Sequence, residues 1–356
     1  MNHLAPSQDP LNFALIGVAG YIAPRDLEAI RQTGNRLVAA TDPSDSVGIL
    51  DRYGFDISYF REIERFDRFL YRSHRGEEDH HVDYVSICTP NYLHDTHIRL
   101  ALRNGCHAIC EKPLVINPWN LDALAALEKE TGCTVSTILQ LRVHPQLVAL
   151  KERLDRERQK AEGDSGGGGP LDTALGNGPR GAPRAEERTH QVDLTYVTSR
   201  GRWYDYSWKG QEELSGGVSV NIGVHFFDLL LWLFGPAREV HVHLRERRRM
   251  AGTMRLERAR VRWFLSVGYE DLPLSARDQG LTTYRSLTMD AEEVEFSGGF
   301  TDLHTEVYRR TLAGQGFGLD DARPAIELTY QIRTVPVEPG PEEPVGFVPQ
   351  RETGQA

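Results

Sequence analysis

Short apolar runs alternate with helical segments between residues 12 and 140, and this alternation constrains the fold more than any other feature. The runs NFALIGV, NRLVAATD, DYVSICTP, HAICEKP and CTVSTILQ are mostly apolar, as expected for strands that are buried on both faces. Helical segments separate them, such as Arg25 to Thr33, HDTHIRLALRNG and NPWNLDALAALEKETG, where Asn117 is a candidate N-cap and Gly132 a stop. Repeated units of this kind predict an α/β fold with a parallel sheet and right-handed crossovers.

From residue 191 the chain becomes β-rich, with QVDLTYVTSRGRWY, REVHVHLRER, TMRLERARVRWFLSVG and YRSLTMDAEEVEFSG. Charged and apolar residues alternate in RLERARVRWFLSV, which indicates a sheet with one face that is solvated or covers a subunit contact. We expect a helix at about 218–234, started by Ser215 and the glycines after it and ended by Gly235–Pro236, and another at Leu303–Leu312. The predicted domains are a nucleotide-binding domain at 11–140, a substrate and oligomerisation domain at 141–335, and an extended tail at 336–356.

Length and charge exclude several classes of protein. A chain of 356 residues is too long for one ordinary core, which agrees with two domains. The net charge of −10 argues against broad nucleic-acid binding, which needs a basic surface. Residues 163–189 are rich in Gly, Pro and Ala and lack apolar periodicity, so they predict a disordered insertion that acts as a spacer, with a regulatory role as the alternative.

The sequence favours a cytoplasmic protein without a membrane partner. The N-terminal stretch MNHLAPSQDPLN has no basic segment followed by an apolar one, so we expect no signal peptide. The longest apolar run, Phe226 to Phe234, is interrupted by Asp228 and is too short to span a bilayer. The four cysteines lie in apolar contexts without the spacing of a metal knuckle, so we expect reduced thiols and no metal site; they are Cys88, Cys106, Cys110 and Cys133.

The stretch GVAGYIA, Gly17 to Ala23, follows the first predicted strand. A dinucleotide site needs a tight turn of small residues and a helix N-terminus that faces the pyrophosphate. The second strand ends at Asp42, where a carboxylate can accept hydrogen bonds from the adenosine ribose and would repel a 2′-phosphate. The pattern therefore favours NAD over NADP. The alternative is an ordinary turn, with Asp42 as a cap of the segment that follows.

Polar residues follow the strand DYVSICT, in the stretch CTPNYLHD. Ligands of a doubly wound sheet lie at the carboxyl ends of its strands, so this stretch is expected to line the cofactor. The candidate residues are Thr89, Pro90, Asn91 and Leu93. His94 and His97 are three residues apart, which allows a metal pair, but we prefer contact with cofactor or solvent from the first turn of a helix.

Two further stretches indicate catalysis. Asn221, His225 and Asp228 are spaced four and three apart, so in one helix they would share a face and line a cleft, with a structural His–Asp pair as the alternative. In CEKP, Lys112 ends a parallel strand, where its ammonium can stabilise the alkoxide that forms as a hydride leaves. A surface lysine that caps the strand is the alternative. Pro113 could make the bond before it cis.

These elements together resemble the Gfo/Idh/MocA oxidoreductases. The resemblance is carried by GVAGYIA, CTPNYLHDTHIRLAL, CEKPLV and the helix with NIGVHFFDLL, and it covers nearly the whole chain except the insertion and the tail. It implies a Rossmann domain followed by an α/β domain with a large, open, mostly antiparallel sheet that often forms oligomer contacts. It also implies an NAD site that comprises Gly17, Ala19, Gly20, Tyr21, Ile22, Asp42, Thr89, Pro90, Asn91, Leu93, His94, Glu111, Lys112 and Gln140.

A narrower resemblance is to the subgroup that oxidises C3 of UDP-N-acetylglucosaminuronate with NAD, in the synthesis of lipopolysaccharide sugars. QLRVHP, SRGRWYDYSWKG and FSGGFTDLHTEVY carry it, with the motifs above. It implies a homotetramer, an aminotransferase that takes the 3-keto product, and 2-oxoglutarate as a candidate reoxidant of NADH. The implied catalytic residues are Lys112, His225 and Asn221, and the implied substrate contacts add Arg142, Arg202 and Lys209.

Several alternatives stay open at this stage. Either Lys112 or His225 can be the base; Asn221 cannot be a charged one, although many family members carry Asp at that position. The enzyme could instead oxidise an inositol or a simple sugar. A non-catalytic NAD-binding sensor and a metal-dependent hydrolase that uses His225 and Asp228 are weaker alternatives.

Overall fold

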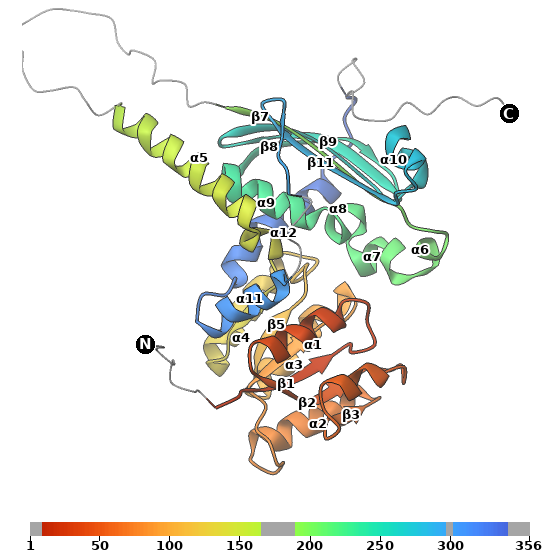
Figure 1. Cartoon of the computed structure of the whole chain (residues 1–356), viewed down its shortest axis with the longest axis vertical. Coiled ribbons are helices and arrows are strands. Elements are labelled where there is room, and N and C mark those ends of the chain that lie inside the picture. Colours follow the sequence, from red (N-terminus) through yellow and green to blue (C-terminus); the bar gives the residue numbers. More distant parts are fainter. Residues whose placement is uncertain (1–8, 165–188, 297–301, 341–356) are drawn as a thin grey trace, which may run out of the picture. The chain divides into compact units, whose positions relative to one another are not determined.

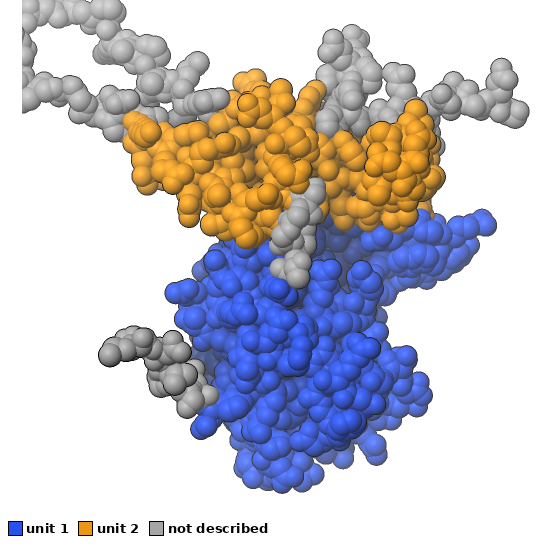
Figure 2. Space-filling model, viewed as in Figure 1, with its two compact units in different colours: residues 1–143, 200–228, 300–334 blue, residues 144–199, 229–299, 335–356 orange. Residues whose placement is uncertain are grey.

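The structure, a computed structural model, describes residues 9–164, 189–296 and 302–340. Most of the predicted insertion, 165–188, and of the predicted tail, 341–356, lies outside these residues. The described chain forms two compact units, each made of several segments: 1–143, 200–228 and 300–334 in unit 1, and 144–199, 229–299 and 335–356 in unit 2 (Figure 2). The linear division near residue 140 stays a prediction.

Unit 1 contains a parallel sheet of six strands in the order β3-β2-β1-β4-β5-β6 (Figure 1). The strands are β1 (Asn12–Ile16), β2 (Arg36–Thr41), β3 (Ser58–Phe60), β4 (Tyr84–Ile87), β5 (His107–Cys110) and β6 (Val135–Thr137). Ala14 and Ile16 of β1 belong to one buried cluster, and Phe13 and Leu15 to another. Both faces of the central strand are therefore covered, which explains its continuous apolar run and confirms the predicted parallel sheet.

Four helices lie between these strands: α1 (Ala23–Gln32), α2 (Ile63–His74), α3 (His94–Arg103) and α4 (Trp119–Thr131). Gly132 ends α4 in the left-handed region, with φ 74°, as predicted. The predicted N-cap Asn117 is wrong, because Pro118 occupies that position and its fixed φ suits a helix start. The amide oxygen of Asn117 instead accepts a hydrogen bond from Arg333 at 3.2 Å.

Two C-terminal helices complete the cover of this sheet. Helix α11 (Leu303–Leu312), at its predicted bounds, contributes Val307 and Tyr308 to the cluster on one face and lies beside α1. Helix α12 (Leu319–Thr334) contributes Leu319 and Ile326 to the cluster on the other face. The end of the described chain thus stabilises the first sheet, a contact between distant segments that local sequence patterns do not reveal.

Unit 2 contains a mixed sheet in the order β12-β11-β7-β10-β9-β8, in which β7 and β10 are parallel and the other pairs are antiparallel. The strands are β7 (His190–Thr198), β8 (Ala237–Arg245), β9 (Arg249–Leu256), β10 (Ala259–Ser266), β11 (Thr283–Met289) and β12 (Glu292–Glu293). Buried and exposed residues alternate in the first half of β10, as its sequence indicates. The predicted mostly antiparallel second sheet is confirmed.

The predicted single helix at 218–234 is wrong. The segment forms α8 (Gly217–Asn221) and α9 (Val224–Phe234), separated by Ile222 and Gly223, after a short α7 (Glu212–Ser215). A glycine in a helix interior is unfavourable and gives the break a local cause. Asn221 therefore ends one helix while His225 lies on the next, and the expected common face holds only for His225 and Asp228. Ser215 ends α7 rather than starting α8, whereas Gly235 follows α9 with φ 85°, as predicted.

The remaining elements are short or peripheral. They are η1 (Gly48–Arg52), η2 (Asn91–Leu93), η3 (Gln140–Val143), α5 (Pro145–Asp164), α6 (Trp203–Tyr206), η4 (Trp208–Gly210), η5 (Tyr269–Asp271) and α10 (Leu274–Asp278). The end of the predicted strand segment QVDLTYVTSRGRWY is thus helical. Within the described residues no single helix is long and apolar enough to cross a membrane, although 212–221 and 224–234 meet that criterion as a pair bent by 47°.

The turn after β1 allows a direct stability test. Gly17 has φ +90°, and a Cβ there would lie 2.9 Å from the backbone carbon of Cys88; Gly34 has φ +79° with nothing within 4 Å of such a Cβ. Gly34→Ala should cost about 1–2 kcal/mol of unfolding free energy from its backbone strain alone. Gly17→Ala should cost roughly 1–3 kcal/mol more, because backbone atoms must move.

Urea unfolding of both variants measures this difference. Equal losses in the two variants would show that the turn can relax around a side chain at position 17.

Candidate active site

The carboxyl ends of β1 and β4 meet at a turn with no room for side chains. The Gly17 N–H donates to the Thr41 carbonyl at 2.8 Å, and a Cβ on Gly20 would lie 3.0 Å from the Gly17 oxygen and 3.3 Å from the Cys88 oxygen. Helix α1 begins just after this turn, and no side-chain hydrogen bond caps its N-terminus. An uncapped N-terminus behind a close backbone turn is suited to a phosphate, so the turn fits a dinucleotide.

Asp42, at the end of β2, lies against the same turn. Its Oδ2 accepts a hydrogen bond from the Ala19 N–H at 3.0 Å, and its Oδ1 accepts one from the Ser44 N–H at 2.9 Å. The carboxylate is thus held at the edge of the turn and is only partly buried. The bond to Ser44 fits the alternative interpretation, in which Asp42 caps the segment that follows. Recognition of a ribose by Asp42 stays a prediction.

The loop after β4 is fixed by two histidines. The ring nitrogens of His94 lie 2.7 Å from the Pro113 oxygen and 2.8 Å from the Thr89 oxygen, and Nδ1 of His97 lies 3.0 Å from Oγ1 of Thr89. Burial is the largest effect on both residues and lowers the pKa of each, that of His97 to about 4. A neutral imidazole carries one N–H, so His94 donates to one of the two carbonyl oxygens. These contacts make both histidines supports of the loop.

The following helices are attached to this loop. Asn91 donates a hydrogen bond to the Ser215 carbonyl at 2.8 Å, and both residues are buried. Ser215 ends α7, which leads directly into α8 and Asn221. Helix α7, which follows the segment that carries Arg202 and Lys209, therefore packs against the predicted cofactor loop within unit 1.

Lys112 follows β5, and its bond to Pro113 is cis. Its backbone N–H donates to Oε2 of Glu111 at 3.2 Å, while Oε1 of Glu111 lies 2.8 Å from Nε2 of His304. Burial lowers the pKa of the Lys112 ammonium, and the Glu111 carboxylate opposes this shift. A lysine with a lowered pKa at the carboxyl end of a parallel strand can accept as well as donate a proton nearer to neutral pH.

Glu111, the residue before Lys112, belongs to a buried polar cluster with Asp26, His304 and Tyr308. Tyr308 donates to Oδ1 of Asp26 at 2.8 Å, and its hydroxyl lies 2.7 Å from Oγ of Ser86. Burial, followed by the charge of Glu111, raises the pKa of Asp26 to about 6. Ligand-type atoms of Asp26, Glu111 and His304 lie within 4.8 Å of one another, and hydrogen bonds engage each of the three residues. Oδ2 of Asp26 is buried and has no hydrogen-bond partner among the described residues.

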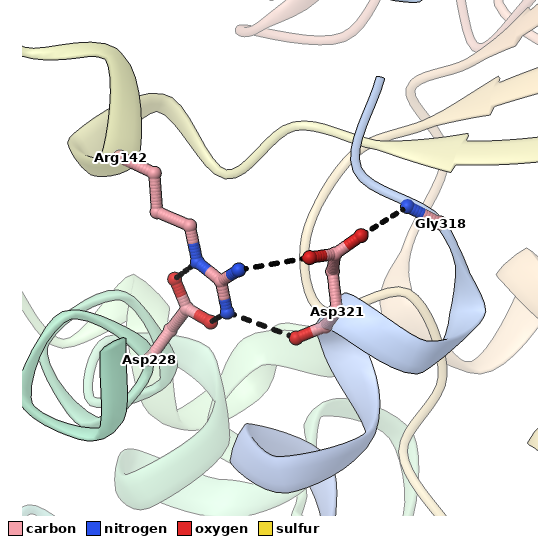
Figure 3. A network of polar contacts seen from close by, with 4 residues as sticks. All are labelled: Arg142, Asp228, Gly318 and Asp321. Atoms are coloured by element: carbon pink, nitrogen blue, oxygen red, sulfur yellow. Dashed lines mark hydrogen bonds and ion pairs between the residues drawn. The ribbon is translucent and has the colours of Figure 1, made fainter. Parts of the chain in front are cut away.

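Arg142 lies in a second buried network (Figure 3). Its Nε and Nη2 donate to the two oxygens of Asp228 at 3.0 and 2.7 Å, and its Nη1 donates to Oδ1 of Asp321 at 3.1 Å. Only 9% of the Arg142 side chain and 3% of that of Asp228 are exposed. Because these bonds occupy the guanidinium, we remove Arg142 from the proposed substrate contacts; it fixes the start of α9, where His225 lies one turn before Asp228.

The other predicted site residues range from buried to exposed. His225 and Asn221 are partly buried, and Arg202 is exposed at the start of α6. Lys209 lies 5.7 and 5.6 Å from the ring centroids of Trp203 and Trp208. Oε1 of Gln140 is buried and has no hydrogen-bond partner among the described residues, so it can accept a hydrogen bond from a ligand. Of the other predicted cofactor residues, Tyr21 is exposed, whereas Pro90, Leu93 and Ile22 are partly buried.

Sequence reasoning missed Asp26, His304 and Tyr308. Each lies on a helix whose apolar spacing is ordinary, and their meeting depends on α11 packing beside α1. The only available signal was the polar character of positions that the helical period places on the buried side, such as Asp26 beside Leu27 and Ile30.

The Arg142 network predicts an unequal response to substitution. Arg142→Met leaves Asp228 buried without its partner and should cost about 3–5 kcal/mol of unfolding free energy. Asp321→Asn is the matched control: its side chain is 41% exposed, so the loss should be about 1 kcal/mol or less. Urea unfolding measures both, and similar losses would contradict the central place of the Arg142–Asp228 pair.

Comparison with known proteins agrees with the geometry. Residues 11–139 match the model of an oxidoreductase family with an NAD-binding Rossmann fold, and residues 188–270 match the model of its C-terminal α/β domain. The first match confirms the predicted NAD-binding domain.

Two solved structures are similar over nearly the whole chain. The WlbA (WbpB) dehydrogenase of Thermus thermophilus, crystallised with NAD and α-ketoglutarate, has a TM-score of 0.81 and 49% identity, over 94% of this chain and 98% of that one. The same enzyme with NAD and UDP-GlcNAcA has a TM-score of 0.81 and 48% identity, over 93% and 97%.

A curated relative is more distant. The D-glucoside 3-dehydrogenase of Escherichia coli (strain K12) is 25% identical over 248 residues, which are 67% of this chain and 59% of the relative. This chain thus covers less than two thirds of the length of that relative. The family models and the Thermus structures nevertheless lead to one assignment: the chain belongs to the Gfo/Idh/MocA family of NAD-binding oxidoreductases.

Proposed function

We propose that this enzyme oxidises the C3 hydroxyl of UDP-N-acetylglucosaminuronate to a ketone, with NAD as the oxidant. The observation that carries the proposal is the 48% identity, over 93% of this chain, to a dehydrogenase crystallised with NAD and UDP-GlcNAcA. The position of oxidation is supported by the narrower sequence resemblance and by the similarity to a glucoside 3-dehydrogenase. The turn at Gly17, Asp42 and the lysine at the end of β5 supply the parts that the reaction needs.

The oxidation removes a hydride from C3 and a proton from O3. NAD, when bound, accepts the hydride. Lys112 holds O3 and stabilises the negative charge that develops on it. His225 takes the proton, directly or through Lys112, and Asn221 orients the hydroxyl or the imidazole. The lowered pKa of Lys112 keeps both residues eligible as the base, so the order of proton transfer between them is open to experiment.

The substrate is anionic, with a uronate carboxylate and a diphosphate, and unit 1 carries basic side chains near Lys112. Burial, then the charge of Arg200, then that of Lys112 lower the pKa of Lys209. Cations that disfavour one another in this way are relieved by an anion placed among them. Lys209 is therefore the stronger candidate for an anionic group of the substrate, while the exposed Arg202 stays a predicted contact.

The wider setting of the proposal rests on the same resemblance. A similar enzyme was crystallised with α-ketoglutarate, which supports α-ketoglutarate as the compound that reoxidises NADH here. We also propose a cytoplasmic homotetramer that hands its 3-keto product to an aminotransferase in lipopolysaccharide sugar synthesis.

A second candidate is oxidation of a simple glucoside, which the similarity to the glucoside 3-dehydrogenase favours. The two candidate substrates differ because the UDP-sugar carries a diphosphate and a simple glucoside does not. UDP alone should compete with the substrate under the first proposal and should have no effect under the second.

Substitution of the proposed reactive lysine tests the mechanism. Lys112→Met should lower kcat by about 10²- to 10⁴-fold, because a group that transfers protons and stabilises charge is lost. NAD affinity, measured by fluorescence titration, should stay within about threefold, since the turn at Gly17 is unchanged. Lys129→Met removes an exposed lysine of α4 and is the matched control, with wild-type turnover.

Absorbance of reduced nicotinamide with NAD and UDP-GlcNAcA, with and without α-ketoglutarate, follows turnover. A fully active Lys112→Met enzyme would remove Lys112 from the mechanism.

A further inference from the structure

We propose that His304 is a positioning residue for Lys112, acting through Glu111. This inference rests on the proposed function, since it assumes that Lys112 handles the substrate hydroxyl. His304 comes from α11, near the end of the described chain, whereas Lys112 follows β5, so the pair links segments that are 192 positions apart. His304 lies in the stretch FSGGFTDLHTEVY, and the resemblance carried by that stretch assigns no role to it.

The carboxylate of Glu111 is held by a different donor at each oxygen. Oε1 lies 2.8 Å from Nε2 of His304, and Oε2 accepts the backbone N–H of Lys112 at 3.2 Å. Glu111 is 5% exposed and His304 is 4% exposed, so water cannot replace either bond. Without His304, Oε1 of Glu111 would lose its partner and the carboxylate could rotate. The hydrogen bond from Oε2 to the backbone N–H of Lys112 would then break, and the Lys112 side chain would lose its fixed direction.

The charges of this pair agree with that role. Burial lowers the pKa of His304, but the hydrogen bond and charge of Glu111 outweigh it and raise the pKa above the ordinary value. Burial raises the pKa of Glu111, but His304 outweighs it, helped by Lys112, and the net pKa is lowered. Both directions favour imidazolium and carboxylate, a charge-assisted bond that is stronger than a neutral one.

The charged groups around the Glu111–His304 pair act on it in both directions. Asp26 faces the pair from α1, and its raised pKa of about 6 leaves a fraction of its carboxyl protonated close to neutral pH. Arg25, also on α1, opposes the charge of His304, while His94 and Lys112 favour the charge of Glu111. Tyr308 lies one turn after His304 on α11 and binds Asp26, so the helix approaches the first sheet through two polar contacts.

The test compares three variants of the full chain. His304→Leu removes the donor and should lower kcat by roughly 10- to 100-fold, because a small misplacement of a reacting group has an effect of this order. The KM for NAD should stay within about threefold. His304→Gln keeps an N–H donor and should recover most of the lost kcat. Thr305→Val is the matched control: it removes a partly buried hydrogen bond from α11 to Gln32 without touching Glu111, and kcat should be unchanged.

A second readout does not depend on the substrate. The pKa of the Lys112 ammonium, followed by NMR with the signal assigned by its loss in Lys112→Met, should shift by about half a unit or more in His304→Leu and stay unchanged in Thr305→Val. Normal kcat and an unshifted Lys112 pKa in a folded His304→Leu enzyme would overturn the proposal. If the wild type fails to oxidise UDP-GlcNAcA, the proposed function fails, and the Lys112 pKa alone decides whether His304 acts on the lysine.

Discussion

The close approach of two backbone segments at the carboxyl edge of the first sheet is the constraint on which the rest of the structure depends. Gly17 ends β1 against the backbone of Cys88, where even a Cβ would lie 2.9 Å from a main-chain atom. Strand order reverses between β1 and β4, since β2 and β3 lie on one side and β5 and β6 on the other. A crevice at such a reversal is where doubly wound sheets bind ligands. Asp42, Thr89, Lys112 and Gln140 all follow strands at this same edge.

Two buried ion pairs lie next to the two proposed reactive residues, Lys112 at this edge and His225 on α9. Glu111 and His304 lie next to Lys112, and Arg142 and Asp228 hold the turn of α9 that carries His225. A buried ion pair is weak evidence for stability, because desolvation offsets much of its attraction, but it defines one geometry. Each pair joins residues that are far apart in the sequence. We therefore interpret both pairs as devices that fix direction rather than as sources of stability.

Much of the fold could be predicted from the sequence, because strands and helix ends are set by residues close together in the chain. Apolar runs predicted five of the six strands of the first sheet, all except the short edge strand β3, and Gly132 and Gly235 ended their helices as expected. The break before α9 was missed because the apolar residues on both sides of Gly223 continue a helical pattern. Asn117 was assigned as a cap from its residue type alone, although Pro118 begins the helix.

The site residues show the same difference between features with local causes and features that depend on the fold. Turns and strand ends, such as Gly17, Asp42 and Lys112, were visible because their position in the chain fixes their position in the sheet. Arg142 shows the limit of local reasoning, since a guanidinium suits a substrate carboxylate and Asp228 equally well, and only the fold shows its pairing with Asp228. His304 and Asp26 could not be found, because their meeting depends on α11 packing beside α1.

The central claim is that the carbon oxidised is C3 of the sugar nucleotide and that its hydride passes to NAD. UDP-N-acetylglucosaminuronate that carries deuterium at C3 tests this most directly, with mass spectrometry of the NADH released. The account predicts NADH that contains the deuterium and a 3-keto product that has lost it. Unlabelled NADH formed with full retention of deuterium in the sugar would contradict the account.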